Sequence, residues 1–502
     1  MSDRFSRQRG LLRQPVVETL RVRLETDSMP EPFVEAMECL AEHLGVRHLS
    51  REVGGKEEGF TVVWDAYDNT VTNQKILSIA YGSNGVFLNG ENAGDLLDPV
   101  YEPAVATIAG CLVWSEILRR AGAFFPVELP KVSVSVNVRV NPNSLYVNMK
   151  SLAFSLQGHD VVPSIRPTDD GSMHQRVLLR LADEDPLVRQ LVERLQVEAV
   201  GAEIEPRTPQ LPIHLPPLAP HLSGHLTLVG AGGLGTWCMH TLVEGLKKAE
   251  HADLTLLVFD KDMEVEAHNL NRQVIYNQAD LGMSKIAATR RWLEACLPSA
   301  KVMTAYELID AMAKEPEDES IDGLDLDELL AELEEGFEIE NSNHVLSINE
   351  VVEQLNATDL VIGCLDAMRP RVLANLIAAQ RGLPYINGGV ANFSGEYSQF
   401  TSQSLVSKYG AEVTNDVKVM SCQEDGAVPL SSMVLTNAFV GAFQALAALQ
   451  RMSGYSTACM DYVCWNAYEN HLIVIDEAGN LQQSACPDII SDALWPREVN
   501  AA

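Results

Sequence analysis

The sequence predicts an α/β fold, and the clearest part of that prediction lies in the second half of the chain. Residues 226–229 form a short apolar run typical of a buried strand, and the residues after it have the 3.6-residue period of a helix. A second apolar run, 254–259, ends at Asp260. The turn after the first run carries glycines in G-x-G-x-x-G spacing, namely Gly230, Gly232 and Gly235. Such a turn lets the backbone approach a phosphate, and an acidic residue ending the second strand can bind ribose, so the pattern predicts a Rossmann-like domain.

Basic residues after the second predicted strand indicate which kind of nucleotide the domain binds. Arg272 ends the run V-E-A-H-N-L-N-R, and Lys285 follows in G-M-S-K. A nicotinamide enzyme needs a surface for a flat ring and has no general need for these cations. A nucleoside triphosphate needs them, because negative charge builds on its phosphates as pyrophosphate leaves. The glycines alone leave nicotinamide or flavin binding open, and the cations favour a nucleoside triphosphate.

The ordered series D-x-D-x-x-V-E-x-x-N-L-N-R-Q, followed by G-x-x-K, resembles the ThiF/MoeB/ubiquitin-activating (E1-like) superfamily over residues 226–449. The resemblance implies ATP and Mg²⁺ as cofactors. Asp366, after the predicted strand 359–364, matches the family's Mg²⁺-binding Asp, although a carboxylate there could also simply cap a strand end. The nucleotide-binding residues that the resemblance implies are Gly230, Gly232, Gly233, Gly235, Asp260, Asp262, Asn269, Arg272, Gln273, Lys285 and Asp366.

Two further segments acquire a role from the resemblance. The opening R-F-S-R-Q, by itself a basic tail, matches a family segment whose second arginine enters the active site of a neighbouring adenylation unit, which makes Arg7 an arginine finger. The run S-C-x-x-x-G-x-x-P before the predicted final helix, 432–449, matches the family's cysteine segment, which makes Cys422 a nucleophile rather than a buried thiol. The catalytic residues are then Arg7, Arg272, Lys285 and Cys422.

Composition and charge limit the class of protein. A chain of 502 residues predicts two or three domains, and its net charge of −32 argues against nucleic-acid binding. No apolar run approaches a membrane span of roughly 20 residues, and the opening residues lack an apolar signal core. Nine scattered cysteines favour a reducing, cytoplasmic location. The chain has no C-x-x-C pair, which many ThiF and MoeB relatives use for structural zinc, so we expect no zinc.

The first half of the chain predicts a second α/β unit. Helical periods occupy 32–44 and 103–121, but residues 1–205 contain neither G-x-G-x-x-G nor N-L-N-R-Q. We interpret this half as an inactive, degenerate adenylation-like domain, with an unrelated α/β domain as the alternative. A Pro-rich linker, 206–222, leads to an active domain over 223–502.

The active domain is predicted to carry two insertions. An acidic one at 311–345 is either a solvated segment or a docking site for a basic partner. The other, 394–425, resembles the crossover loop that passes over the bound tail of the family's protein substrate.

Taken together, the resemblance implies an enzyme that adenylates the C-terminus of a ubiquitin-like protein, forms a thioester on Cys422 and passes the protein to an E2-like partner. Its layout resembles the E1 of bacterial ubiquitin-like conjugation operons, with a role in antiviral defence. Such an enzyme would act as a homodimer or an intramolecular pseudo-dimer, without nucleic acid or membrane. The alternatives are a MoeB/ThiF-type adenylyltransferase for a sulfur-carrier protein, a non-catalytic scaffold for a ubiquitin-like fold and, last, a dehydrogenase.

Overall fold

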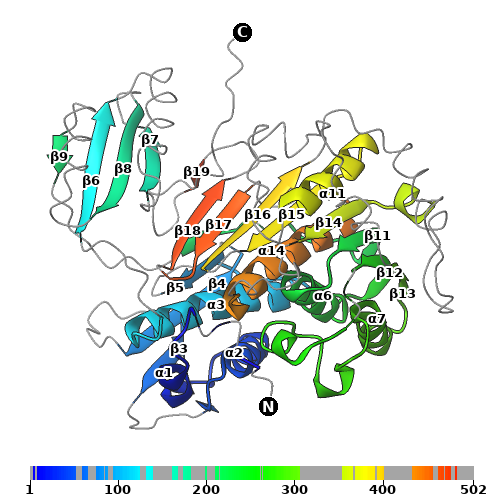
Figure 1. Cartoon of the computed structure of the whole chain (residues 1–502), viewed down its shortest axis with the longest axis horizontal. Helices are drawn as coiled ribbons and strands as arrows, with labels where there is room; N and C mark the ends of the chain where they lie inside the picture. Colours follow the sequence, from blue (N-terminus) through cyan, green and yellow to red (C-terminus); the bar gives the residue numbers. More distant parts are fainter. Residues whose placement is uncertain are drawn as a thin grey trace.

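The structure is a computed structural model of the chain (Figure 1). It describes residues 4–5, 8, 10–51, 59–65, 75–83, 85–88, 94–124, 132–139, 161–167, 173–181, 198–200, 210–213, 215–260, 262, 264–305, 353–365, 368–390, 393–400, 432–455, 462–468, 470–475 and 481–482. Three of the predicted site residues, Arg7, Asp366 and Cys422, lie outside these ranges, as does the acidic segment 311–345.

The C-terminal half is built on one mixed sheet, which has nine strands within the described residues. The first five strands of the sheet, in the spatial order β13-β12-β11-β14-β15, are parallel to one another. From β15 onward, each strand pairs antiparallel with the next. The strands in this order are β13 (Lys301–Ala305), β12 (His251–Phe259), β11 (His221–Val229), β14 (Leu360–Cys364), β15 (Tyr385–Val390), β16 (Ser394–Phe400), β17 (Tyr462–Asn466), β18 (His471–Ile475) and β19 (Leu481–Gln482). The helices are α6 (Gly233–Leu246), α7 (Lys285–Cys296), α11 (Met368–Gln380) and α14 (Val434–Met452), with the 3₁₀ turns η2 (Ala267–Asn269) and η3 (Gln278–Asp280).

The N-terminal half has its own sheet, of six strands within the described residues. In spatial order these are β10 (Gln210–Pro212), β5 (Gly85–Leu88), β4 (Ile76–Gly82), β3 (Phe60–Trp64), β1 (Arg21–Leu24) and β2 (His48–Arg51). Its helices are α1 (Gln14–Thr19), α2 (Glu31–Leu44) and α3 (Glu102–Arg120). A separate antiparallel sheet contains β6 (Val132–Arg139), β7 (Val161–Pro167), β8 (Met173–Leu181) and β9 (Glu198–Val200).

The two large sheets share one topology. The order β2-β1-β3-β4-β5-β10 corresponds strand for strand to β12-β11-β14-β15-β16-β17, with the same parallel and antiparallel pairings. Helix α2 follows β1 as α6 follows β11, and α3 precedes β10 as α14 precedes β17. The two halves therefore repeat one arrangement of strands and helices.

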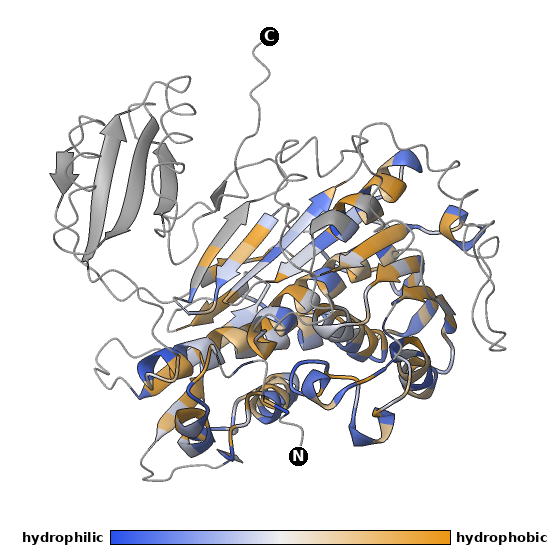
Figure 2. Ribbon diagram, viewed as in Figure 1, coloured by the Kyte–Doolittle hydropathy of each residue, from blue (hydrophilic) through white to orange (hydrophobic). Residues whose placement is uncertain are grey.

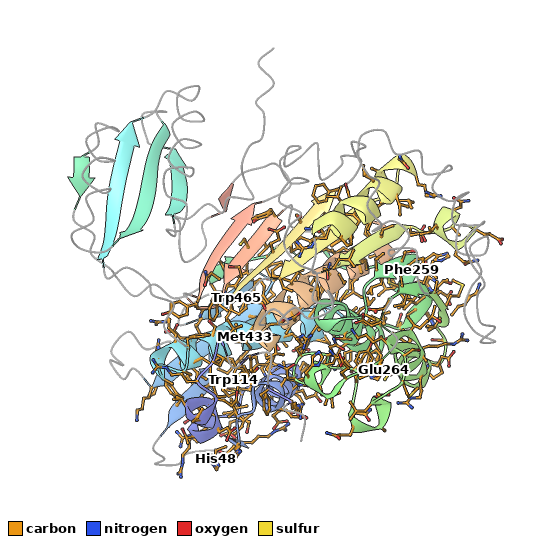
Figure 3. The ribbon with its side chains drawn as sticks, in the orientation of Figure 1. His48, Trp114, Phe259, Glu264, Met433 and Trp465 are labelled. Atoms are coloured by element: carbon orange, nitrogen blue, oxygen red, sulfur yellow. The ribbon has the colours of Figure 1, made fainter. Side chains whose placement is uncertain are left out.

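The four corresponding helices meet between the two sheets. Helix α14 contacts α6, α3 and α2, and α3 contacts α6 (Figure 1). The apolar residues of these helices belong to one continuous core, and orange, hydrophobic ribbon marks it in Figure 2. Trp114 of α3 and Trp465 of β17 are fully buried in it (Figure 3), and Trp114 donates to the carbonyl of Met37 on α2 at 3.0 Å. The core thus joins the halves across their interface.

Most helix predictions are confirmed, and the differences are local. The periods at 32–44 and 103–121 form α2 and α3, and the predicted final helix forms α14. The Pro-rich segment 206–222 is partly structured, because β10 pairs with β5 and β11 begins at His221. The predicted crossover segment opens with strand β16. Among the described helices, none is long and apolar enough to span a membrane.

Candidate nucleotide-binding site

The glycine-rich turn between β11 and α6 is held by close backbone packing. Gly230 has φ +102°, and a Cβ there would lie 2.5 Å from the carbonyl oxygen of Cys364 on β14. A Cβ on Gly235 would overlap the carbonyl oxygen of Gly230. Side chains are therefore excluded at both positions, so that the turn can connect the strand to the helix while staying close to β14.

Gly232 faces open space. Among the described residues, no atom lies within 4 Å of where its Cβ would be. Gly232 is the N-cap of α6, no side chain caps the helix start, and no described residue accepts from the N–H groups of Gly233 and Leu234. Free N–H groups at a helix start, next to open space, form a phosphate-binding arrangement.

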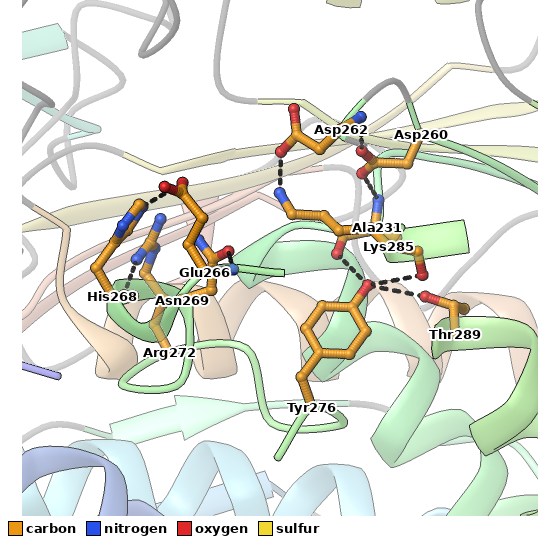
Figure 4. Close-up of polar contacts among 10 residues, drawn as sticks. All are labelled: Ala231, Asp260, Asp262, Glu266, His268, Asn269, Arg272, Tyr276, Lys285 and Thr289. Atoms are coloured by element: carbon orange, nitrogen blue, oxygen red, sulfur yellow. Dashed lines mark hydrogen bonds and ion pairs between the residues drawn. The ribbon is translucent and has the colours of Figure 1, made fainter. Parts of the chain in front are cut away.

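Asp260 directly follows the last residue of β12 and faces the glycine-rich turn. Its carboxylate accepts from the N–H of Ala231 at 2.6 Å and from the N–H of Asp262 at 2.8 Å (Figure 4). Burial raises the pKa of this carboxyl, and the Lys285 ammonium opposes that rise. The sequence predicted that Asp260 binds ribose. In the structure, its hydrogen bonds with the N–H groups of Ala231 and Asp262 hold the turn in place.

Lys285 is the first residue of α7 and is buried. Ser284 caps the helix by accepting from the N–H of Ala287 at 3.3 Å. The ammonium of Lys285 forms an ion pair with Asp262 (Figure 4). The backbone N–H of Lys285 donates to the carbonyl of Asp262 at 3.2 Å. These contacts bring two predicted site residues together beside Asp260.

The segment N-L-N-R-Q begins at Asn269, the last residue of the turn η2, and a capping box between Glu266 and Asn269 closes this turn. Asn269 accepts from the N–H of Glu266 at 2.8 Å, so its side chain shapes the segment. Arg272 is buried and donates to the carbonyl of His268 at 2.8 Å. Gln273 is buried as well, and its Oε1 has no hydrogen-bond partner among the described residues.

Two residues that the sequence reasoning did not single out connect these parts. The hydroxyl of Tyr276 donates to the carbonyl of Ala231 at 2.9 Å, and it lies 2.8 Å from the hydroxyl of Thr289 on α7 (Figure 4). The indole of Trp237 on α6 donates to the carbonyl of Arg272 at 3.0 Å. Both are buried aromatic residues with a polar tip, and only the tertiary contacts show which carbonyls they bind.

ATP fits the described part of this site. The open space at Gly232, the N–H groups of α6 and the buried Lys285 suit phosphates. Two buried polar atoms of the N-L-N-R-Q segment, Asn271 Nδ2 and Gln273 Oε1, have no described partner and remain available to a ligand.

Asp366 and Cys422, the residues predicted from the sequence to bind Mg²⁺ and to act as the thiol nucleophile, lie outside the described residues. Within the described part of the chain, no group of three or more His, Cys, Asp or Glu residues could hold a metal ion. Cys364 is buried in β14, and burial raises the pKa of its thiol well above the usual value.

A Rossmann-like α/β domain with a glycine-rich turn, a buried Lys and a buried Arg defines a class of nucleotide-binding proteins. The model of the ThiF family matches residues 221–487. The chain belongs to the ThiF family, and its fold is that of the family's adenylation domain.

The chain is also similar to individual proteins of known activity or known structure. The chain is 26% identical to the molybdopterin-synthase adenylyltransferase of Escherichia coli (strain K12) over 237 residues, which cover 45% of this chain and 72% of that protein. A crystal structure of PaaA matches 50% of this chain and 72% of its own, at 16% identity and a TM-score of 0.35. A crystal structure of E. coli MccB with MccA matches 82% of this chain and 97% of its own, at 12% identity and a TM-score of 0.34.

Proposed function

We propose that the protein is an ATP-dependent adenylyltransferase that activates the C-terminal carboxylate of a ubiquitin-like protein. The observation that carries the proposal is the open space and the free N–H groups at the start of α6, within a ThiF-family domain. The buried Lys285 is held near the same turn, because the hydroxyl of Tyr276 contacts the carbonyls of both Ala231 and Lys285, at 2.9 Å and 3.4 Å. The similarity to molybdopterin-synthase adenylyltransferase supports adenylation as the reaction.

The chemistry follows from the charges. The carboxylate oxygen attacks the α-phosphorus, the bond from the α-phosphorus to the bridging oxygen breaks, and pyrophosphate leaves with the electron pair. Lys285 and Arg272 offset the charge that develops on the leaving phosphates. Mg²⁺, held by Asp366, would neutralise further phosphate charge. Asp260 keeps the glycine-rich turn against the phosphates through its bond to Ala231.

The N-terminal half is proposed as the inactive partner of an intramolecular pseudo-dimer. Its sheet has the topology of the active half, which supports this assignment. The segment between β1 and α2 has no glycine, and it carries Glu25 and Asp27, which repel phosphate. Pro32 removes an N–H from the first turn of α2, and the N–H of Phe33 already donates to Pro30 at 3.0 Å. The half therefore lacks the donors that α6 offers.

Arg7 is proposed as an arginine finger that acts on the active half of its own chain. Its neighbours in sequence support this arrangement. Arg4 donates to the carbonyl of Leu270, beside Arg272, at 3.2 Å, and Gln8 donates to the carbonyl of Leu44 at the end of α2 at 2.9 Å. Both ends of the R-F-S-R-Q segment are thus anchored near the candidate site.

Pyrophosphate exchange tests adenylation. Exchange of labelled pyrophosphate into ATP should require a ubiquitin-like protein with a free C-terminus, and Asp366→Ala should abolish it because Mg²⁺ is no longer held. Undiminished exchange in Asp366→Ala would remove the metal assignment.

The fate of the adenylate separates two candidate functions. In an E1-like enzyme, Cys422 attacks the acyl carbon, AMP leaves, and the thioester goes to an E2-like protein. In the second candidate the adenylate activates a sulfur carrier, which the similarity to molybdopterin-synthase adenylyltransferase favours. A reductant-sensitive adduct that disappears in Cys422→Ala while exchange persists supports the first. Exchange without any adduct supports the second.

A further inference from the structure

Helix α2 of the N-terminal half is connected to the segment that carries Arg272 through Arg4 and Trp237, although α2 contributes no residue to the predicted nucleotide site. Two adjacent residues of α2 make the connection. Glu42 accepts from the guanidinium of Arg4 at 3.1 Å, and the Nε of Arg4 donates to the carbonyl of Leu270 at 3.2 Å. His43 packs its ring against that of Trp237, with centroids 5.8 Å apart.

The second contact continues to Arg272 itself. The indole N–H of Trp237 donates to the carbonyl of Arg272 at 3.0 Å. His43 is held in turn, because its Nδ1 donates to the carbonyl of Cys39 one helical turn earlier at 2.9 Å. His43 and Trp237 are both buried, so the ring contact has little freedom to shift.

We propose that Arg4 and Trp237 are positioning residues through which α2 fixes the main chain on both sides of Arg272. The proposal rests on the assignment of Arg272 to the phosphates of ATP. Arg4 holds the carbonyl two residues before Arg272, and Trp237 holds its own carbonyl. Because the backbone is fixed at both points, the guanidinium of Arg272 is already restricted before ATP binds. It therefore loses less conformational entropy on binding.

The role differs from general stabilisation of the fold. The side chain of Arg4 is 33% exposed and that of Glu42 68% exposed, so this ion pair contributes little to folding stability. The ion pair instead orients Arg4 for its hydrogen bond to the carbonyl of Leu270, which belongs to the N-L-N-R-Q segment.

Nucleotide binding tests the proposal without any protein substrate. Isothermal titration calorimetry should show that Arg4→Ala and Trp237→Phe each weaken ATP binding by about fivefold, the effect of one lost hydrogen bond. AMP binding should change by less than about twofold, because AMP lacks the phosphates that Arg272 contacts. In an Arg272→Ala background, Arg4→Ala should have no further effect on ATP.

Arg51→Ala is the matched control, because Arg51 also pairs with glutamates of α2, Glu31 and Glu38, on the helix that holds Glu42. It should leave the affinities for ATP and AMP unchanged. Hydrogen exchange of residues 266–276 should increase in Arg4→Ala and Trp237→Phe but not in Arg51→Ala.

Three results would overturn the proposal: equal losses of ATP and AMP affinity, a full effect of Arg4→Ala in the Arg272→Ala background, or unchanged hydrogen exchange. Absence of pyrophosphate exchange in the wild-type protein would instead refute the proposed function. It would leave these binding measurements intact, so the two failures are distinguishable.

Discussion

Replacing Gly232 with alanine should separate folding from nucleotide binding. Gly232 has φ −79° in an extended conformation that alanine adopts, and no described atom lies within 4 Å of the new methyl group. The substitution should therefore cost no packing energy. Alanine also restricts the unfolded chain, which stabilises a protein by roughly 0.4–1 kcal/mol where the native conformation suits it.

The same methyl group should harm binding. It would occupy the open space beside the N–H groups of Gly233 and Leu234, where we place the phosphates. Moving the triphosphate off these donors removes at least one charge-assisted hydrogen bond, worth about 1.5–3 kcal/mol, which corresponds to a loss of affinity of at least about tenfold.

Thermal unfolding and calorimetric ATP titration measure the two effects on one preparation. Gly232→Ala should unfold at or slightly above the wild-type temperature and bind ATP at least about tenfold more weakly. Gly235→Ala is the control, because its methyl group overlaps the carbonyl of Gly230 and must lower the unfolding temperature. Wild-type ATP affinity in a folded Gly232→Ala protein would refute the placement of the phosphates.

Two other predictions concern the parts around the turn. Tyr276→Phe leaves the buried carbonyl of Ala231 without its 2.9 Å donor, so the unfolding temperature should fall and the KM for ATP rise several-fold in exchange assays; an unchanged KM would show that the turn needs no such support. If Arg7 acts on its own chain, a mixture of Arg7→Ala and Lys285→Ala proteins should remain as slow in pyrophosphate exchange as either variant alone, with losses of about 10²-fold, whereas recovery in the mixture would show action between chains.

Local patterns allowed the sequence to predict the elements around the site. The apolar run before Gly230 became the end of β11, and the predicted helices became α2, α3, α6 and α14. In α2 the helical period is strong because the helix buries one face, whereas α14 is buried nearly all round and is marked in the sequence by its apolar composition. Periodicity carries no information about the order of strands, so the repeated topology of the two sheets emerged only from their pairing.

The candidate site was predictable in its charged residues and less so in their contacts. Lys285 and Asp262 were expected near one nucleotide, and the structure pairs them. The bond of Asp260 to Ala231 and the bonds of Tyr276 and Trp237 to carbonyl groups were not foreseen. Every residue has a backbone carbonyl, so the sequence does not show which carbonyl accepts from a given hydroxyl or indole. Only the fold shows which of them lies within hydrogen-bonding distance.

Product analysis tests the central claim most directly. The wild-type protein is incubated with ATP, Mg²⁺ and a ubiquitin-like protein, and the products are identified by intact-protein mass spectrometry and nucleotide chromatography. Adenylation predicts AMP, either attached to the ubiquitin-like protein or released when a thioester forms, together with an equal amount of pyrophosphate, both lost when the C-terminal carboxylate of the ubiquitin-like protein is amidated. Release of ADP and phosphate, with no AMP on the ubiquitin-like protein, would contradict adenylation and show that the site transfers the terminal phosphate of ATP instead.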